Sequence, residues 1–262
     1  MIAFFGSGIH TGICADIRIE PRTGEGIEFV AQNGRVPACP ACLTETGGRS
    51  TTLESGPVRI RTVEHLLAAL ICTRPHATVH VSGPEIPILD GSAAPFVAGL
   101  PQATDSAVPP RLSCRREIRI ARNGSVAVLS LCERDEEPAY TVVLDYAHPA
   151  MGDLTFTFRP FADDFATQVA PARTFALEEE VPDLFRQGLA AGGGLHNALV
   201  IGRDGPLNPG GMRFSNEPAR HKMLDLLGDL ALLGALPHAH LRIEKPGHGI
   251  HHALVRSIAA SL

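Results

Sequence analysis

Apolar and polar residues alternate with a period of two in six short segments of the chain, which is typical of strands with one buried face. These segments are residues 15–19, 26–30, 78–81, 117–120, 126–131 and 140–145. Apolar residues spaced three and four apart predict three helices, at residues 63–72, 177–189 and 218–233. Because strands and helices interleave without a regular strand–helix–strand rhythm, the pattern favours an α+β fold over a doubly wound sheet.

A polar, proline-containing stretch at residues 101–111 (PQATDSAVPPR) predicts a linker. It divides the chain into a domain at residues 1–104 and a second at residues 111–262. Both have the size of ordinary independent domains.

A short internal similarity supports this division. The helix that begins near Glu64 is followed by Pro75-His76-Ala77 and a strand, and the helix around His221 is followed by Pro237-His238-Ala239 and a strand. We therefore expect two similar domains, each of which offers a helix-borne histidine to a shared cleft.

Charge and composition narrow the classes of partner. The 262 residues carry a formal net charge of −5, which is not the basic footprint of a nucleic-acid-binding protein, so we expect a small-molecule partner. The N-terminal apolar run is too short for a signal peptide, and no apolar stretch is long enough to span a bilayer. We therefore expect a cytoplasmic protein with reduced cysteines.

Cys39-Pro40-Ala41-Cys42 has the spacing of a metal knuckle or a redox pair. A structural zinc site needs a second such pair, which the remaining cysteines do not supply. A redox pair is expected to open a helix, whereas this one lies in a stretch rich in proline and glycine. Metal or redox function at this pair is therefore the minor alternative.

The segment 220–230 (RHKMLDLLGDL) carries His221 and Asp225 four residues apart, so that both lie on one face of a helix. An imidazole nitrogen and a carboxylate oxygen in this arrangement can bind one metal ion, and Asp229 lies one turn further along. The alternative is an amphipathic helix whose charged residues are merely solvated. A metal site here needs a third ligand.

Glu64-His65 offers that ligand at the start of an apolar helix, for which Thr62 is a candidate cap. The alternative is a polar helix start without function, and the His-x-x-Glu-His zinc motif is not met because residue 61 is Arg. With His221 and Asp225, His65 would complete a three-ligand zinc site whose fourth position is open.

His248 lies between Gly247 and Gly249, in what we interpret as a loop that can meet a substrate. A nearby carboxylate such as Asp229 could keep this histidine protonated. His251 and His252 follow, and the alternative is that all three histidines are surface residues.

Seven segments in the same order resemble the UDP-3-O-acyl-N-acetylglucosamine deacetylase family, the zinc enzymes of the first committed step of lipid A synthesis. They are residues 6–12 (GSGIHTG), 62–70 (TVEHLLAAL), 87–96 (PILDGSAAPF), 172–175 (ARTF), 188–198, 220–230 and 247–248. Because several motifs match at the correct relative spacing across nearly the whole chain, chance is not a serious explanation.

The resemblance implies a role for each matching residue. His65, His221 and Asp225 fall on the zinc ligands, although two His and one Asp also suit Fe²⁺. Glu64 falls on the general base and His248 on the general acid.

Further roles follow from the same resemblance. Asp229 falls on the carboxylate that orients the general acid, Thr174 on the threonine that helps to hold the oxyanion, and Lys222 on a lysine near the substrate. Lys222 is one of only two lysines among 23 basic residues. The parts that approach the nucleotide correspond to His10, Asp145 and Tyr146.

The fold that the resemblance implies is two similar domains, each a β-sheet with a pair of helices, with the helices packed between the sheets. An insert at residues 174–201 would form the acyl-chain passage. Its candidate lining residues are Phe175, Leu177, Leu184, Phe185, Leu189 and Leu195. The resemblance implies the acylated UDP-sugar as the small-molecule partner. We expect no nucleic acid, in line with the net charge, and a monomeric chain, with peripheral contact at the inner membrane surface as an open alternative.

The match departs from the family pattern at several positions. The strand before the first glycine motif is short, which predicts a sheet edge that is weak or differently built, and His196 stands where Asp is common. Two alternatives stay open: a paralogue that deacetylates a different N-acetylated sugar, and a non-catalytic nucleotide-sugar binder.

Overall fold

The alternating segments of the first half form a five-stranded sheet in the computed structural model, which describes residues 2–44, 49–100, 108–151 and 154–262. The strand order is β1-β2-β8-β3-β4. The strands are β1 (Ile2–Ser7), β2 (Cys14–Pro21), β3 (Ile27–Ala31), β4 (Gly34–Pro37) and β8 (Ala77–Val81). Every second residue of β2 is buried, so one face of the sheet packs into the core.

The second half forms a six-stranded sheet in the order β10-β11-β17-β12-β13, to which β9 (Arg111–Ser113) adds by pairing with β17. The strands are β10 (Ile118–Arg122), β11 (Ser125–Leu131), β12 (Tyr140–Val143), β13 (Thr155–Phe158) and β17 (Leu236–Glu244). In both sheets the central strand pairs antiparallel with one hairpin and parallel with the other. In the first sheet β8 pairs antiparallel with β2 and parallel with β3. In the second sheet β17 pairs antiparallel with β11 and parallel with β12. This shared topology agrees with the internal similarity of the sequence.

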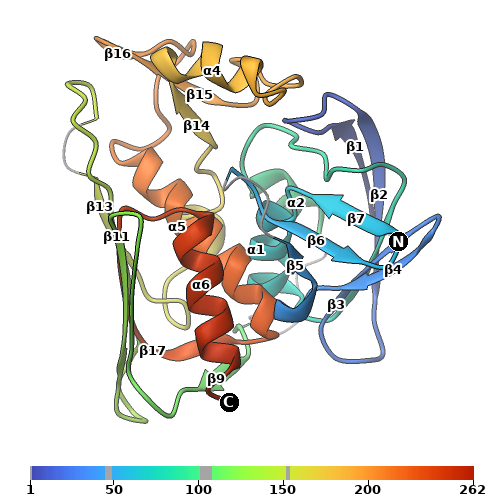
Figure 1. Cartoon of the computed structure of the whole chain (residues 1–262), viewed down its shortest axis with the longest axis vertical. Coiled ribbons are helices and arrows are strands. Elements are labelled where there is room, and N and C mark those ends of the chain that lie inside the picture. Colours follow the sequence, from blue (N-terminus) through green and yellow to red (C-terminus); the bar gives the residue numbers. More distant parts are fainter. Residues whose placement is uncertain (1, 45–48, 101–107, 152–153) are drawn as a thin grey trace.

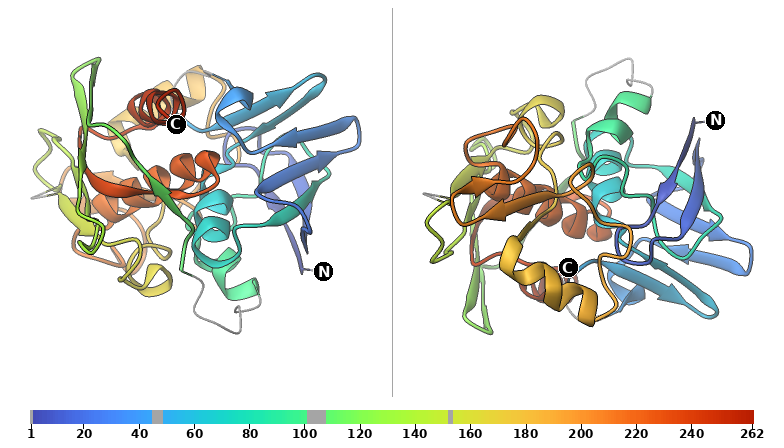
Figure 2. Two further views of the ribbon diagram at one scale, coloured as in Figure 1. Left: turned by 90° about the horizontal axis from the view of Figure 1, so that it is seen from below. Right: turned by 90° about the horizontal axis from the view of Figure 1, so that it is seen from above.

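Helices from both halves lie between the two sheets (Figures 1 and 2). They are α1 (Glu64–Thr73) and α2 (Ala94–Gly99) from the first half, and α5 (Glu217–Leu230) and α6 (His248–Ala259) from the second. The helices α1 and α5 meet where a Cβ atom placed on Gly228 would overlap the carbonyl group of Glu64. Glycine at this position therefore allows the two backbones to touch, which brings the first turn of α1 against α5.

Smaller elements complete the chain. Two three-stranded sheets consist of β5 (Leu43–Thr44), β6 (Thr52–Ser55) and β7 (Val58–Arg61), and of β14 (Phe175–Leu177), β15 (Leu199–Gly202) and β16 (Gly205–Pro206). The short helices are η1 (Pro40–Cys42), α3 (Phe165–Gln168), η2 (Glu178–Glu180), α4 (Val181–Arg186) and η3 (Ala231–Leu233). The sheet β14–β16 and α4 form an insert that lies beyond the ends of the central helices, at the top of Figure 1.

The predicted α+β fold, with helices packed between two sheets, is confirmed. The predicted linker lies mostly at residues 101–107, outside the described residues, so the domain boundaries stay predictions. Among the described residues, no helix has the length and apolar character that a membrane span requires.

Three local predictions are wrong. The helix expected at residues 177–189 is helical only from Val181 to Arg186, after a strand and a 3-10 turn. Thr62 does not cap α1, because its hydroxyl donates a hydrogen bond to Glu85 Oε1 (2.7 Å). The first strand is not a weak edge, since β1 pairs with β2 from Ile2 to Ser7.

Candidate active site and metal centre

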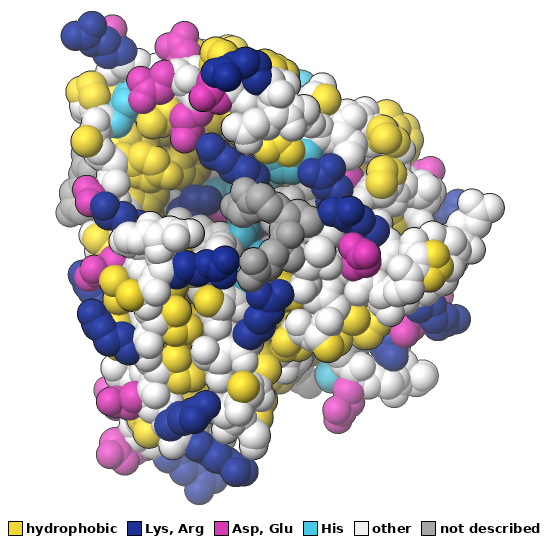
Figure 3. Space-filling model, in the orientation of Figure 1, with side chains coloured by type: hydrophobic (Ala, Val, Ile, Leu, Met, Phe, Trp, Pro, Cys, Tyr) yellow, Lys and Arg dark blue, Asp and Glu magenta, His cyan; other side chains and the backbone are white. Residues whose placement is uncertain are grey.

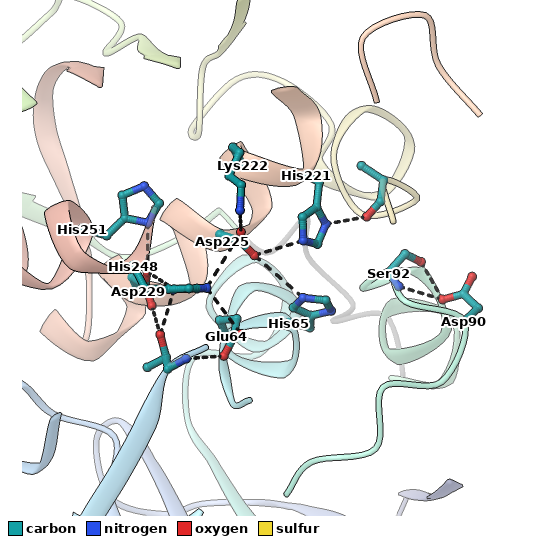
Figure 4. A network of polar contacts seen from close by, with 12 residues as sticks. Glu64, His65, Asp90, Ser92, His221, Lys222, Asp225, Asp229, His248 and His251 are labelled. Atoms are coloured by element: carbon teal, nitrogen blue, oxygen red, sulfur yellow. Dashed lines mark hydrogen bonds and ion pairs between the residues drawn. The ribbon is translucent and has the colours of Figure 1, made fainter. Parts of the chain in front are cut away.

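Two helices bring the three predicted metal ligands together. His221 and Asp225 lie one turn apart on α5, and His65 comes from the first turn of α1 (Figure 4). Asp225 Oδ1 lies 3.3 Å from His221 Nε2 and 3.8 Å from His65 Nε2. All three side chains are buried, and each offers one ligand atom within 4.8 Å of the others. The geometry therefore suits one small cation.

Hydrogen bonding and protonation in this cluster fit a metal ion. His221 Nδ1 donates to the carbonyl oxygen of Ala172 (3.1 Å), which leaves the Nε2 lone pair for a ligand. Asp225 Oδ1, which faces both imidazoles, is buried and has no hydrogen-bond partner among the described residues. Burial lowers the pKa of His65 to about 3 and also lowers the pKa of His221. Neutral imidazoles beside a carboxylate are what metal ligation requires.

Asp225 stays ionised despite its surroundings. Burial opposes its charge, but the positive charges that face it, His221 when protonated and Lys222, hold the pKa of this carboxyl well below its usual range. Lys222 Nζ lies 2.9 Å from Asp225 Oδ2 and 5.3 Å from the centre of the Phe175 ring. Lys222 therefore lies at the edge of the predicted metal centre.

The predicted base and acid face each other beside these ligands. Glu64 Oε1 lies 3.6 Å from His248 Nε2. Burial raises the pKa of Glu64 to about 8. Burial alone would lower the pKa of His248, but the charges of Asp229 and Glu64 outweigh it and raise this pKa to about 9. Contrary to the interpretation as a loop residue, His248 is the first residue of α6.

Asp229 is the centre of a buried polar cluster. Its Oδ2 accepts hydrogen bonds from His248 Nδ1 (2.8 Å) and His251 Nδ1 (2.9 Å), and its Oδ1 accepts one from the hydroxyl of Thr51. His252 Nε2 lies 3.5 Å from Oδ1. The alternative that these histidines are surface residues is therefore wrong.

The ligands and the Glu64–His248 pair open into a cavity of about 310 Å³. Thr174, Phe175, Leu184 and Phe185 of the insert region line it. On the face shown in Figure 3, the surface is hollowed beneath the insert, and hydrophobic side chains gather beside the hollow. A cavity that joins a polar floor to an apolar wall suits an amphiphilic ligand.

The other passage candidates do not belong to this lining. Leu177 is buried in the hydrophobic core, and Leu195 is 44% exposed. Leu189 is also absent from the part of the lining that the structure describes. The apolar wall is therefore composed differently from the prediction, with Val181 and Val200 beside Phe175, Leu184 and Phe185.

The predicted nucleotide-binding residues are brought together only in part. His10 and Tyr146 line the cavity, and Tyr146 packs edge-on against Phe175 with ring centres 6.0 Å apart. Asp145 does not join them, because it is exposed and its Oδ2 lies 3.1 Å from Lys245 Nζ. The departure at His196 is exposed and also lies outside the described lining.

Sequence reasoning missed several residues around the site. Arg49 lines the cavity, and the buried Glu85 accepts hydrogen bonds from the backbone of His10 (3.0 Å) and Thr11 (2.7 Å). Neither residue lies at a recognisable spacing from a motif, so tertiary contacts alone identify them. Thr51, which contacts both Glu64 and Asp229, was missed for the same reason.

The Cys39–Cys42 pair is not part of this site. The two sulfur atoms lie 3.6 Å apart beside η1. Among the described residues, no His, Asp, Glu or further Cys joins them as a third metal ligand.

Comparisons with known proteins identify the family of the chain. The model of the family described as UDP-3-O-acyl N-acetylglycosamine deacetylase matches residues 1–260. Proteins named UDP-3-O-acyl-N-acetylglucosamine deacetylase are similar: that of Nostoc sp. is 38% identical, over 99% of this chain and 96% of the relative. The protein of Thermosynechococcus vestitus is 38% identical, over 97% of this chain and 90% of the relative. The protein of Syntrophotalea carbinolica is 36% identical, over 98% of this chain and 84% of the relative. This chain therefore belongs to the UDP-3-O-acyl-N-acetylglucosamine deacetylase family.

Proposed function

We propose that this protein hydrolyses the acetamide of a UDP-3-O-acyl-N-acetylglucosamine, with release of acetate and the free amine, in lipid A synthesis. The observation that carries the proposal is the Glu64–His248 pair, whose facing atoms lie 3.6 Å apart beside three convergent metal ligands. Amide hydrolysis needs a base for water and an acid for a poor leaving group, and this pair supplies both. The names of the similar proteins support the same reaction.

His65, His221 and Asp225 would hold one divalent metal ion, which we infer to be zinc, with Fe²⁺ as the alternative that the same donors allow. When bound, the metal supplies Lewis-acid activation of a water molecule and of the acetamide carbonyl. His221 is held in the correct tautomer by Ala172, and this fixes the direction of its free lone pair.

Glu64 and His248 move the protons of the reaction. Glu64 accepts a proton from the attacking water as the new carbon–oxygen bond forms. His248, kept cationic by Asp229, donates a proton from Nε2 to the amide nitrogen as the carbon–nitrogen bond breaks. The bond electrons leave with the nitrogen as a neutral amine.

Thr174 and Lys222 would stabilise the transition state and hold the substrate. Both residues line the cavity beside the predicted metal ligands. A hydroxyl and an ammonium placed before the reaction begins stabilise the negative charge that develops on the carbonyl oxygen.

The apolar wall of the cavity favours an acylated substrate. Phe175, Leu184 and Phe185 would contact the acyl chain, while His10 and Tyr146 would approach the nucleotide. Asp145 would reach the nucleotide only after leaving its ion pair with Lys245. We place the protein in the cytoplasm as a monomer, with peripheral contact at the inner membrane surface as an extension of the proposal.

This function is tested by measuring acetate release from UDP-3-O-acyl-N-acetylglucosamine by the purified protein. The assay is run on the protein as purified, after chelation of the metal, and after zinc is added back. Activity that disappears on chelation and returns with zinc supports the proposal. Faster turnover of unacylated UDP-N-acetylglucosamine would instead support the paralogue. Nucleotide-sugar binding without acetate release, in protein that holds one metal per chain, would support the non-catalytic binder.

A further inference from the structure

Thr51 is bonded to both halves of the proposed proton-transfer machinery. It lies directly before β6, is fully buried, and is 13 residues from Glu64 and 178 from Asp229 in the sequence. Its backbone N–H donates to Glu64 Oε2 (3.0 Å), and its hydroxyl bonds to Asp229 Oδ1. One residue therefore connects the carboxylate of the base with the carboxylate that holds the acid.

The direction of each bond follows from the donors that are available. An ionised carboxylate only accepts hydrogen bonds, so the single hydroxyl proton of Thr51 points to Asp229. Thr51 Oγ1 also lies 2.9 Å from His252 Nε2 and 3.1 Å from His248 Nδ1, and both ring nitrogens must then face it as donors. The Thr51 hydroxyl therefore accepts a hydrogen bond from α6 and donates one to Asp229 on α5.

These bonds orient the Asp229 carboxylate. Its Oδ2 is occupied by His248 Nδ1 and His251 Nδ1, and its Oδ1 by the Thr51 hydroxyl. Without the hydroxyl, Oδ1 would lose this donor, and the carboxylate could turn about its bond to Cβ. Because His248 is held through Nδ1, such a turn would move its Nε2 relative to Glu64 Oε1.

We propose that Thr51 is a positioning residue for the deacetylation, which sets the place of Glu64 through its N–H and the place of His248 through its hydroxyl and Asp229. This inference rests on the proposed function. Partners that orient reacting groups without touching the substrate affect turnover by roughly tenfold to a hundredfold when they are removed.

Thr51→Val tests the hydroxyl, because valine keeps the shape and the backbone N–H. We expect kcat to fall at least about tenfold with KM within about twofold of the wild type, and Thr51→Ser to restore kcat to within about threefold. The matched control is Thr73→Val at the other end of α1, where the lost hydroxyl bond goes to the carbonyl of Ala69 (2.6 Å). This control should keep the wild-type kcat.

Thermal unfolding and bound metal are measured for each variant. If Thr51→Val does not fold, Thr51→Ala removes the hydroxyl without placing a methyl group against the carboxylate, and the same kcat loss is expected. An unchanged kcat in a folded variant without the hydroxyl overturns the inference, as does an equal loss in Thr51→Ser. A wild-type protein that releases no acetate would instead count against the proposed function. Failure of the proposed function can therefore be told apart from failure of the Thr51 inference.

Discussion

Glu64 and His248 are each the first residue of a helix, α1 and α6, and their side chains meet with Oε1 and Nε2 3.6 Å apart. The partial positive charge of a helix N-terminus favours an anion such as the Glu64 carboxylate and disfavours a cation such as protonated His248. The Asp229 carboxylate, 2.8 Å from His248 Nδ1, compensates for this effect. The proposed general acid, His248, therefore depends on Asp229 for its positive charge.

A first prediction separates metal binding from proton transfer. His65→Ala removes one of three ligands, so we expect loss of both bound metal and activity. Glu64→Gln keeps the ligands and removes the base, so bound metal should persist while kcat falls by about 10²- to 10⁴-fold. Metal analysis and acetate release on the same samples measure both quantities. Full activity in Glu64→Gln would show that the base is misassigned.

The pH dependence of kcat should report the state of His248. Activity requires this imidazole to be protonated and Glu64 to be ionised, and their pKa values are raised to about 9 and about 8, so the rate should rise toward pH 8 and fall above about pH 9. Asp229→Asn removes the negative charge that raises this pKa. The alkaline limb of the pH profile should then move to lower pH, and an unchanged limb would contradict the role of Asp229.

Metal removal should lower the thermal stability of the folded protein. A ligand that binds the folded state and not the unfolded state stabilises it, so chelation should lower the melting temperature and zinc add-back should restore it. His65→Ala serves as the control, because its melting temperature should not respond to zinc. A wild-type melting temperature that is independent of metal would contradict a site built from His65, His221 and Asp225.

Phe185 should contribute to the affinity for the acyl chain. It lines the cavity and is 55% exposed, so a bound acyl chain can cover it. In Phe185→Ala we expect KM for the acylated substrate to rise about five- to tenfold, which corresponds to roughly 1 kcal/mol of lost apolar contact. Leu207→Ala, at a residue that is 46% exposed and outside the described lining, is the control and should leave KM unchanged.

The contact between α1 and α5 should be sensitive to a single carbon atom. In Gly228→Ala the new Cβ would overlap the Glu64 carbonyl, so the free energy of unfolding should fall by about 2 kcal/mol or more and metal affinity should weaken. Gly249→Ala is the control, because a Cβ in this position on α6 meets nothing within 4 Å and should stabilise the helix by about 0.5–1 kcal/mol. Chemical denaturation measures both.

The predictions from sequence were most successful where one regular element fixes the geometry. The helical spacing of His221 and Asp225 places them side by side whatever surrounds the helix, and the family motifs add His65. The helix α6 was missed because two glycines flank His248, although Ile250, Leu254, Val255 and Ile258 repeat at helical spacing and are buried.

Other features depend on contacts between segments that are far apart in the sequence. The bonds of Thr51 and the polar cluster at Asp229 join both halves of the chain, and neither has a local signature. The ion pair between Asp145 and Lys245, which keeps Asp145 out of the cavity, is equally a product of the folded arrangement. The motifs identified Asp229 as the partner of His248, but they missed the contacts of Thr51 and His251 with Asp229 and the ion pair of Asp145.

The backbone contact at Gly228 also limits how the molecule can move. A hinge motion that separated the two halves would carry His65 away from Asp225, and Glu64 away from His248, because each pair spans the junction between α1 and the second half. We therefore expect the proposed catalytic cleft to be preformed rather than closed over its substrate by a rotation of the two halves. We then expect adaptation to acyl chains of different length in the outer part of the insert, at α4, because Phe175 of β14 packs edge-on against His221 with ring centres 6.2 Å apart.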